Sequence, residues 1–329
     1  MKVLIIQLRQ LGDVLLSTPL AEAIKYEKPE YEVHFLTSDT AYDIVSENPY
    51  IDKILTLKKG IANEIKTIKN VISEHYDAVI DVQRTGRSKR ITLFSFAKSR
   101  VAFRRPKENF YYNTLIKQTT HGYTAFERMD LLMGIGVNPK KKFMPRLFFL
   151  KENMQSVEEY LKSEKIGKFF IVAPTARKAS KMWQIEDFGR LVNFIEEQTN
   201  LKPIVVYGVE SERSIAVEVG KYAKNAHIIK RPFSIKEFAA LVNLSSFFIG
   251  NDSFPAHVAV SQNAKTVVIC GPTSGWFLKN KNTFLVYKGL SCQPCNSPES
   301  CTLNLLCYTS LKSDEVFKKI SPFLFDSSS

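Results

Sequence analysis

The sequence has no long apolar run. No uninterrupted stretch of its 329 residues approaches the roughly 18 apolar residues that a membrane-spanning helix needs. The apolar run that opens the chain ends at Ile6, before Gln7 and Arg9, and this is too short for the core of a signal peptide. Hydrophobic residues make up 44% of the chain and charged residues 24%, as in ordinary globular proteins. We therefore expect a cytoplasmic protein.

The glycine pattern of dinucleotide-binding enzymes is also missing. A strand expected at 3–7 leads into a loop with Gly12 alone, where G-x-G-x-x-G would let the backbone approach a pyrophosphate. This excludes a nicotinamide-dependent dehydrogenase. The loop offers Asp13 instead, at the carboxyl end of the strand and in the first turn of a helix. That position suits a helix cap that contributes about 1 kcal/mol, and it suits equally a general base that points into a cleft.

Acidic residues are missing from one basic segment. The formal net charge is +13, and nine Lys or Arg residues lie between Arg84 and Lys107 without any Asp or Glu. Such a segment favours a phosphorylated partner or an anionic membrane surface, and it is also typical of a solvated helix face. Nucleic acid is not expected as a partner, because the aromatic residues of the segment are isolated phenylalanines and no recognition motif accompanies them.

The chain alternates short apolar runs with amphipathic stretches, which predicts βαβ units and parallel sheets. Residues 132–150 are rich in Gly, Pro and Lys, so we expect a boundary there between domains at 1–150 and 151–329. We predict an α/β fold of two Rossmann-like, doubly wound domains that face each other across a cleft, with ligands at the carboxyl ends of the strands. The predicted strands are 3–7, 33–37, 54–57, 78–82, 169–173, 203–207, 226–229, 247–250 and 266–270. The predicted helices are 12–26, 61–72, 185–197, 210–223, 235–244 and one that begins at 255, and 103–123 is predicted as a loop.

Residues 250–257, GNDSFPAH, are typical of a strand end, a tight turn and a helix start. Asp252, Ser253 and His257 then lie where unpaired N–H groups and the helix dipole favour an anion, and a diphosphate fits that position. Thr175 and Lys181 follow another expected strand, where a lysine can neutralise a leaving phosphate and a hydroxyl can donate to its oxygens. Alone, Lys181 is one of 46 basic residues and indicates nothing.

Together these segments resemble glycosyltransferase family 9, the ADP-heptose:lipopolysaccharide heptosyltransferases, along nearly the whole chain. Two motifs carry the resemblance, Gly-Asp-x-x-x-x-[Ser/Thr]-Pro at 12–19 and Gly-Asn-Asp-Ser-x-x-x-His at 250–257. Segments 48–52, 77–81, 181–183 and 271–273 add to them. The resemblance implies a GT-B fold and inverting transfer of a heptose from a nucleotide diphosphate sugar, with no metal required. It implies further that 1–150 binds the acceptor and 151–329 the donor.

The resemblance also implies roles for single residues. Asp13 would be the base that deprotonates the acceptor hydroxyl, and Lys181 would favour the departure of ADP. Phe254 stands where the family usually has glycine, and Thr175 replaces the glycine of a Pro-Gly pair, so both bear on the choice of donor. The implied donor-binding residues are Thr175, Ala176, Glu210, Phe233, Asp252, Ser253 and His257.

The basic segment gains a role from the resemblance. The implied acceptors are anionic glycolipids, sugar-extended lipid A molecules, which are presented on the inner face of the inner membrane. We therefore expect a protein that is peripheral to that membrane surface. The residues expected to contact the acceptor or the membrane are Arg84, Arg87, Lys89 and Arg90.

Four of the five cysteines lie within one short segment. Their spacing, C-x₂-C-x₅-C-x₅-C, is compact enough to hold zinc or an iron–sulfur cluster, and unligated structural thiols fit it equally well. A cytosolic location argues against disulfides. The four residues are Cys292, Cys295, Cys301 and Cys307.

Two alternatives stay open beside the heptosyltransferase. One is a GT-B transferase that uses another nucleotide sugar or another acceptor. The other is a catalytically silent, membrane-surface binding subunit that has kept the fold. Asp13 and Lys181 argue against it, and Phe254 leaves some room for it. A nucleotide-sugar epimerase is less favoured, because it normally uses more carboxylates and histidines and the chain has five histidines.

Overall fold

The structure, a computed structural model, describes residues 1–106 and 108–325 and divides the chain into two compact units between Phe148 and Phe149. In the first unit, six strands form one parallel sheet in the order β3-β2-β1-β4-β5-β6. The two central strands, β1 and β4, are nearly continuous apolar runs that are buried on both faces, as is usual in parallel sheets. The strands are β1 (Lys2–Ile6), β2 (Glu32–Ser38), β3 (Lys53–Leu57), β4 (Ala78–Asp81), β5 (Ser99–Phe103) and β6 (Thr114–Ile116).

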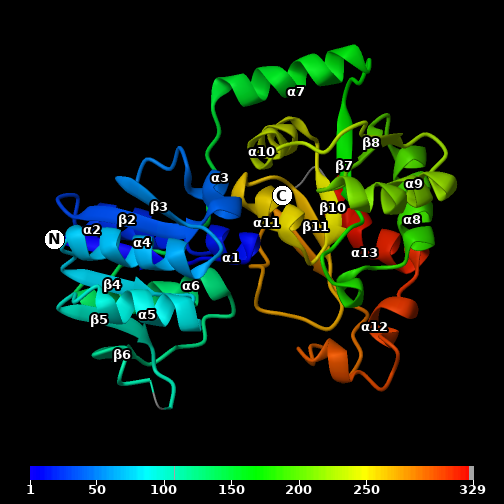
Figure 1. The fold of residues 1–329 in the computed structure, drawn as a ribbon. Coiled ribbons are helices and arrows are strands. Elements are labelled where there is room, and N and C mark those ends of the chain that lie inside the picture. The colour runs from blue at the N-terminus through cyan, green and yellow to red at the C-terminus, as the bar shows by residue number, and fades with distance from the viewer. Residues whose placement is uncertain (107, 326–329) are drawn as a thin grey trace. The chain divides into compact units, whose positions relative to one another are not determined.

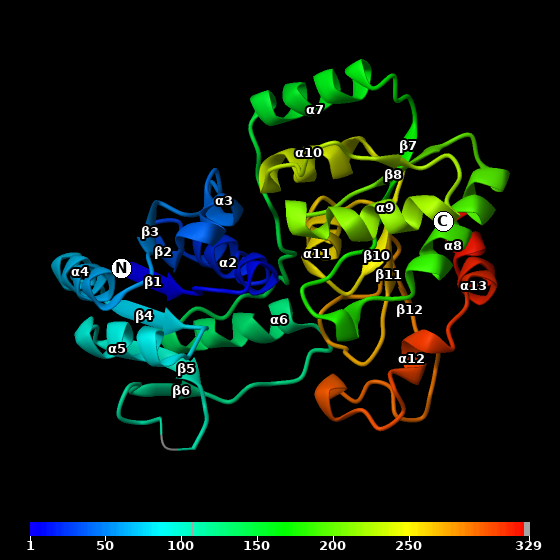
Figure 2. The ribbon, with the colours of Figure 1, turned by 45° about the vertical axis from the view of Figure 1, so that its right-hand side comes forward.

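Helices cover both faces of this sheet. On one face α4 and α5 lie side by side, as Figures 1 and 2 both show. Val71 of α4 and Ile91 of α5 pack there against Leu4 and Val79 of the sheet, and all four side chains are fully buried. The helices of the unit are α1 (Leu11–Leu15), α2 (Pro19–Glu27), α3 (Tyr42–Val45), α4 (Ile61–Ser73), α5 (Gly86–Phe94) and α6 (Thr124–Met129).

The second unit repeats the arrangement with a sheet in the order β12-β11-β10-β7-β8-β9, again parallel throughout. In both sheets the chain first winds in one direction and then returns to the middle to wind in the other. The strands of the second unit are β7 (Phe169–Ala173), β8 (Lys202–Val205), β9 (His227–Ile228), β10 (Phe248–Asn251), β11 (Thr266–Ile269) and β12 (Thr283–Val286).

Helices α8, α9 and α13 pack together on one face of this sheet, and α7, α10 and α11 pack on the other (Figure 1). Helix α10 begins with a capping box, in which the Ser234 hydroxyl and the Glu237 carboxylate each accept a backbone N–H of the other residue. Arg231 and Ser156 also bind the Glu237 carboxylate. The helices are α7 (Lys151–Ser163), α8 (Ile185–Gln198), α9 (Arg213–Tyr222), α10 (Ile235–Leu244), α11 (Phe254–Ser261), α12 (Leu306–Thr309) and α13 (Ser313–Phe325).

The predicted α/β class, with two doubly wound units, is confirmed, and three local predictions are wrong. The helix expected at 12–26 is two helices, because Pro19 has no N–H to continue the first and instead begins the second. The loop expected at 103–123 contains strand β6. The helix expected at 210–223 begins with a 3₁₀ turn, Glu210–Glu212, before α9. Within the described residues, every helix is too short or too polar to span a lipid bilayer.

Candidate active site

Both sheets have a point where the winding direction reverses, and ligands of doubly wound folds bind at the carboxyl ends of the strands beside it. In the first unit the reversal lies between β1 and β4, and in the second between β7 and β10. Asp13 follows β1, whereas Thr175 follows β7 and Asp252 follows β10. The motif residues thus lie at the edge of each sheet where the fold favours a ligand.

In the first unit, Asp13 is paired with Arg128 of α6. The Arg128 guanidinium donates to Oδ1 and to the backbone carbonyl of Asp13, and to the Ser17 hydroxyl at 2.9 Å. Arg128 is 8% exposed, whereas 27% of the Asp13 side-chain surface is exposed. The carboxylate is therefore held in place by a buried cation while part of it stays open to solvent.

The loop before Asp13 is tied to the loop after β4 by one side chain. The Gln83 amide oxygen accepts three N–H groups, from the Gln7 side chain at 2.8 Å and from the backbones of Leu8 and Arg9 at 3.0 and 2.9 Å. Gln83 therefore fixes the segment that leads from β1 into α1.

The basic residues after β4 are paired more fully than their sequence suggests. Arg87 and Arg90 both bind Glu64 of α4, with Nε–O distances of 3.2 and 2.6 Å. The hydrogen bonds from Arg90 and Arg87 hold the pKa of the Glu64 carboxyl below its usual range, although burial opposes the shift. Arg90 is half exposed, and Arg87 is one-third exposed.

Glu108 pairs with the other two cations of this set, Arg84 at 3.3 Å and Lys89 at 2.8 Å. Burial raises the pKa of the Glu108 carboxyl, but the bond from Lys89 and the charge of Arg84 outweigh it and leave the pKa lowered. Only 6% of the Arg84 side chain is exposed. The basic segment therefore has less unpaired positive charge than its sequence indicates, because Glu64 and Glu108, which lie outside the segment, pair with four of its cations. Lys107, the last of the nine cations, lies outside the described residues.

In the second unit, Lys181 and Asp252 form an ion pair with an Nζ–Oδ2 distance of 2.9 Å. The Thr273 hydroxyl donates to the same carboxylate oxygen. Asp252 is 3% exposed, and the Lys181 ammonium also lies 5.9 Å from the centre of the Trp276 ring. Lys181 is thus held at the carboxyl edge of the sheet by a buried anion and an aromatic face.

Two polar side chains join the loops around this pair. Asn251 accepts the Trp183 N–H at 2.9 Å and donates to the Pro174 carbonyl at 2.7 Å. The Ser253 hydroxyl donates to the Thr175 carbonyl at 3.2 Å. The loops after β7 and β10 are therefore one connected structure.

The start of α11 lies within this structure. Ser253 is the residue before the helix, Phe254 is its first residue and is half-buried, and Pro255 has no N–H to leave unpaired. His257 is 8% exposed and stacks on Phe277, with ring centres 4.3 Å apart. In the first turn of α11 the N–H groups of Ala256 and His257 bind the Ser253 carbonyl, so what the turn offers to an anion is mainly the helix dipole.

Tyr308 packs beneath the loops that carry Lys181. Its hydroxyl lies 3.3 Å from the carbonyl oxygens of Lys181 and Ile269. Its ring lies against Gly271, where a Cβ atom would come within 2.3 Å of the ring. Position 271 therefore needs glycine because of close packing.

The other residues expected to bind the sugar donor differ in how far their side chains are exposed. Glu210 follows β8, and its side chain is 68% exposed, with Arg213 at 3.7 Å. Ala176 is half-buried in the loop after Thr175, which is itself 4% exposed. Phe233 is 9% exposed, because its ring packs edge-on against Tyr160 of α7. Phe233 is therefore held largely within the second unit.

Sequence reasoning missed Arg128, Trp276 and Phe277, and it assigned no role to Thr273. Thr273 lies in segment 271–273, which the resemblance included, so a signal for it was present. Trp276 and Phe277 follow within four residues. Arg128 lies more than a hundred residues from its partner Asp13, in a segment without a motif.

The four clustered cysteines do not form a metal site among residues 1–106 and 108–325. The sequence left a metal site and unligated thiols equally open, and no group of three or more His, Cys, Asp or Glu side chains in this part of the chain is placed to hold an ion. All four are free thiols. Two sulfur atoms face the backbone instead, Cys301 accepting the Leu305 N–H at 3.4 Å and Cys295 lying 3.9 Å from the Pro272 carbonyl.

The chain is similar to proteins of known activity. Over 84% of its length it is 27% identical to lipopolysaccharide heptosyltransferase 1 of Campylobacter coli, of which the match covers 85%. Its fold matches a glycosyltransferase family 9 protein from Veillonella parvula with a TM-score of 0.85 at 19% identity, covering 99% and 97% of the two chains. It matches Escherichia coli ADP-heptose LPS heptosyltransferase II with a TM-score of 0.79 at 14% identity, covering both chains completely.

A more distant structural match, with a TM-score of 0.60 at 14% identity over 98% of this chain and 75% of the other, is TibC of enterotoxigenic Escherichia coli, described as an iron-containing dodecameric glycosyltransferase. These likenesses confirm the GT-B fold class. The family model of glycosyltransferase family 9 (heptosyltransferase) matches residues 65–305, well over half of the chain. The chain is therefore an enzyme that belongs to glycosyltransferase family 9, the heptosyltransferases.

Proposed function

We propose that this enzyme is an inverting heptosyltransferase that moves a heptose from ADP-heptose to the inner core of lipopolysaccharide. The named relatives support the sugar and the product class. The observation that carries the proposal is the cluster of Lys181, Asp252 and Thr273 beside the start of α11. We assign donor binding to the second unit, 151–329 in the sequence prediction, and acceptor binding to the first, 1–150.

The donor diphosphate would bind at the first turn of α11, where the helix dipole favours negative charge. Lys181 is already fixed by Asp252, so little side-chain freedom is lost when it meets the diphosphate. Ser253, His257, Thr175 and Ala176 would line this site. Further along the same edge of the sheet, Glu210 would accept hydrogen bonds from the ribose, and Phe233 would border the base.

The reaction is a displacement at the anomeric carbon. The acceptor hydroxyl gives its proton to the Asp13 carboxylate, and its oxygen attacks the anomeric carbon from the side opposite the diphosphate. The bond between that carbon and the diphosphate oxygen breaks, and ADP leaves with the electron pair. Lys181 and the dipole of α11 stabilise the charge that develops on ADP, so the proposal does not require a metal.

The acceptor would be an anionic glycolipid at the cytoplasmic face of the inner membrane. Arg87 and Arg90 keep exposed surface for it although both bind Glu64. Lys89 is 22% exposed, whereas Arg84 is almost fully enclosed with Glu108 and would act by holding that loop.

Calorimetry with ADP, UDP, GDP and ADP-heptose tests the proposal. We expect tight binding of ADP and ADP-heptose only, and at least tenfold weaker binding by Lys181→Met, since a charged hydrogen bond is worth about 1.5–3 kcal/mol. Lys178→Met is the matched control, because Lys178 lies in the same loop and pairs with exposed Glu299.

Preference for UDP or GDP would replace the sugar and keep the fold, which is the alternative GT-B activity. A folded sample that binds none of the four, and releases no nucleotide, would establish the silent binding subunit in its place. Equal affinity of the two lysine variants would remove Lys181 from the site.

A further inference from the structure

The outer face of helix α4 carries an exposed row of isoleucines. Ile61, Ile65 and Ile72 are 79%, 50% and 36% exposed, and their spacing of four and seven residues places them on one side of the helix. The adjoining side of α4 supplies Val71 and the partly buried Ile68 to the core. The isoleucine row therefore borders the buried side of the helix and leaves half or more of Ile61 and Ile65 exposed.

The neighbouring helix α5 ends in two exposed aromatic residues, Phe94 and Phe96, which are 42% and 72% exposed. Phe96 has a φ of 53° directly after the C-cap residue Ser95, at the position where helices usually have glycine. A phenylalanine in this left-handed conformation is strained and gains little burial within the unit. A ligand outside the unit would account for an aromatic ring at this position.

These five side chains belong to one surface, because α4 and α5 are joined by the bonds from Arg87 and Arg90 to Glu64 and lie side by side in Figures 1 and 2. Exposed apolar groups gathered in this way mark interaction sites on soluble proteins. We name this surface the α4–α5 face. Its apolar members are Ile61, Ile65, Ile72, Phe94 and Phe96.

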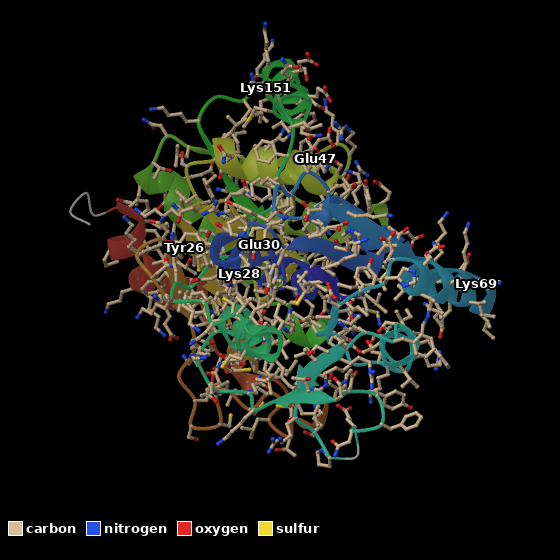
Figure 3. The ribbon with its side chains drawn as sticks, turned by 90° about the vertical axis from the view of Figure 1, so that its left-hand side faces the viewer. Tyr26, Lys28, Glu30, Glu47, Lys69 and Lys151 are labelled. Carbon is tan, nitrogen blue, oxygen red and sulfur yellow. The ribbon has the colours of Figure 1, made fainter. Side chains whose placement is uncertain are left out.

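The α4–α5 face is also strongly basic. Figure 3 shows Lys69 extending from α4 away from the unit. Among residues 58–73 the single acid is Glu64, which is 7% exposed and bound to two arginines. With one carboxylate against six cations the face has a formal charge of +5. The cations are Lys58, Lys59, Lys66, Lys69, Arg87 and Arg90.

We propose that the α4–α5 face binds the surface of an anionic lipid bilayer. The isoleucines and phenylalanines enter the boundary between headgroups and acyl chains, and the lysines and arginines lie at the lipid phosphates, as in interfacial amphipathic helices. A second copy of the chain fits less well, because a two-fold contact would set the same six cations against each other. The inference deepens the proposed function, on which it rests for its purpose, since an acceptor carried by lipid is met at such a surface.

Sedimentation with lipid vesicles tests the inference on the full chain. We expect binding to vesicles that contain phosphatidylglycerol, weaker binding to phosphatidylcholine vesicles, and a decrease with added salt. The variant Ile61→Ser/Ile65→Ser/Phe96→Ser should weaken binding about a hundredfold, since three exposed apolar groups that would be buried in the bilayer are lost. Lys66→Glu/Lys69→Glu should weaken it about twentyfold or more, because each cation near an anionic bilayer contributes roughly a fivefold factor.

Matched variants in the second unit control for hydropathy and net charge. Val217→Ser/Leu303→Ser/Leu306→Ser removes three apolar groups that are 39%, 51% and 40% exposed. Lys221→Glu/Lys224→Glu makes the same change of charge as the lysine variant. Both should bind vesicles as the unchanged protein does, and all four variants should keep its circular dichroism spectrum and unfolding temperature.

Three results would overturn the inference. These are equal vesicle binding by the α4–α5 variants and their controls, equal binding of the unchanged protein to both kinds of vesicle, or a dimer in sedimentation velocity that the α4–α5 variants dissociate. ADP release from ADP-heptose with deacylated lipopolysaccharide core reports the proposed function separately. Lost vesicle binding with unchanged ADP release is expected for the variants. Vesicle binding by a protein that releases no ADP would refute the proposed function alone.

Discussion

Replacement of Asp13 by asparagine separates the two functions that its position allows. As a general base, the carboxylate contributes roughly 10²–10⁴ in rate, equal to about 3–5 kcal/mol of the barrier. As a partner of Arg128, it contributes a charged hydrogen bond worth about 1.5–3 kcal/mol. Part of that contribution survives in Asp13→Asn, because Arg128 keeps its bonds to the Asp13 carbonyl and to Ser17. We expect a stability loss of about 1 kcal/mol.

Arg128→Met is the control that the structure provides. It removes the same ion pair and leaves the carboxylate in place. We expect Asp13→Asn to lower the unfolding temperature by 2–4 °C, the shift that about 1 kcal/mol produces in a domain of this size. Arg128→Met should lower it further, because this variant also loses the bonds to the Asp13 carbonyl and to Ser17. Only Asp13→Asn should lower kcat by about a hundredfold or more.

The assay is ADP release at saturating ADP-heptose, with donor affinity measured by calorimetry and stability by thermal circular dichroism. Donor affinity should stay nearly unchanged in Asp13→Asn, because Asp13 is assigned to the acceptor. If Arg128→Met lost as much turnover as Asp13→Asn, the carboxylate would be a structural partner and another group would be the base.

Three further predictions concern the second unit. Gly271→Ala should lower the free energy of unfolding by about 1–3 kcal/mol in urea titrations, because the new methyl group overlaps the Tyr308 ring. Glu237→Gln should destabilise the unit most near neutral pH, because hydrogen bonds from the arginine partner lower the pKa of Glu237 from 4.5 to about 2. The stability that the carboxylate contributes is therefore present above pH 4.5 and is lost as the pH falls towards 2. Urea unfolding at a series of pH values measures this. Cys292 should react with iodoacetamide within the folded protein, whereas Cys307 should resist, because burial raises its thiol pKa, and peptide mass spectrometry checks both.

Each of these has a matched comparison. Gly167→Ala should be harmless, since no atom lies within 4 Å of the added carbon, and equal loss in both glycine variants would refute the packing argument. Glu158→Gln changes an exposed glutamate and should leave the pH profile as it is. Uniform protection of all four clustered thiols, reversed by a chelator, would establish the metal site that the described residues lack.

The sheets and the edge that carries the site could be predicted from the sequence. Runs such as Phe169–Ala173 are apolar at every position, which indicates strands buried on both faces, and the polar residues that follow them mark the carboxyl edge. The predicted strands leave out β5, β6 and β12. Strand β6 could not be found in this way, since Thr114–Ile116 is three residues long and half-buried.

Ion pairs between residues far apart in the chain could not be predicted from the sequence. The basic segment has no acid within it, so its neutralisation by Glu64 and Glu108 depends on how α4 and the loop after β5 fold back. The bond between Asp13 and Arg128 likewise joins residues more than a hundred positions apart. Periodicity reports local structure, whereas these contacts follow from the topology of the sheet.

Gln83 has a consequence for how sequence variation in this enzyme would be interpreted. Its amide oxygen gathers three N–H groups of the segment before Asp13, although 70 positions separate the two residues. A saturation mutagenesis screen would therefore score Gln83 as essential in the manner of a residue that contacts substrate. Which substitutions position 83 tolerates would also depend on the side chain at position 7, because the Gln7 amide donates to Gln83. Positions 7 and 83 should therefore show epistasis and change together in evolving lineages.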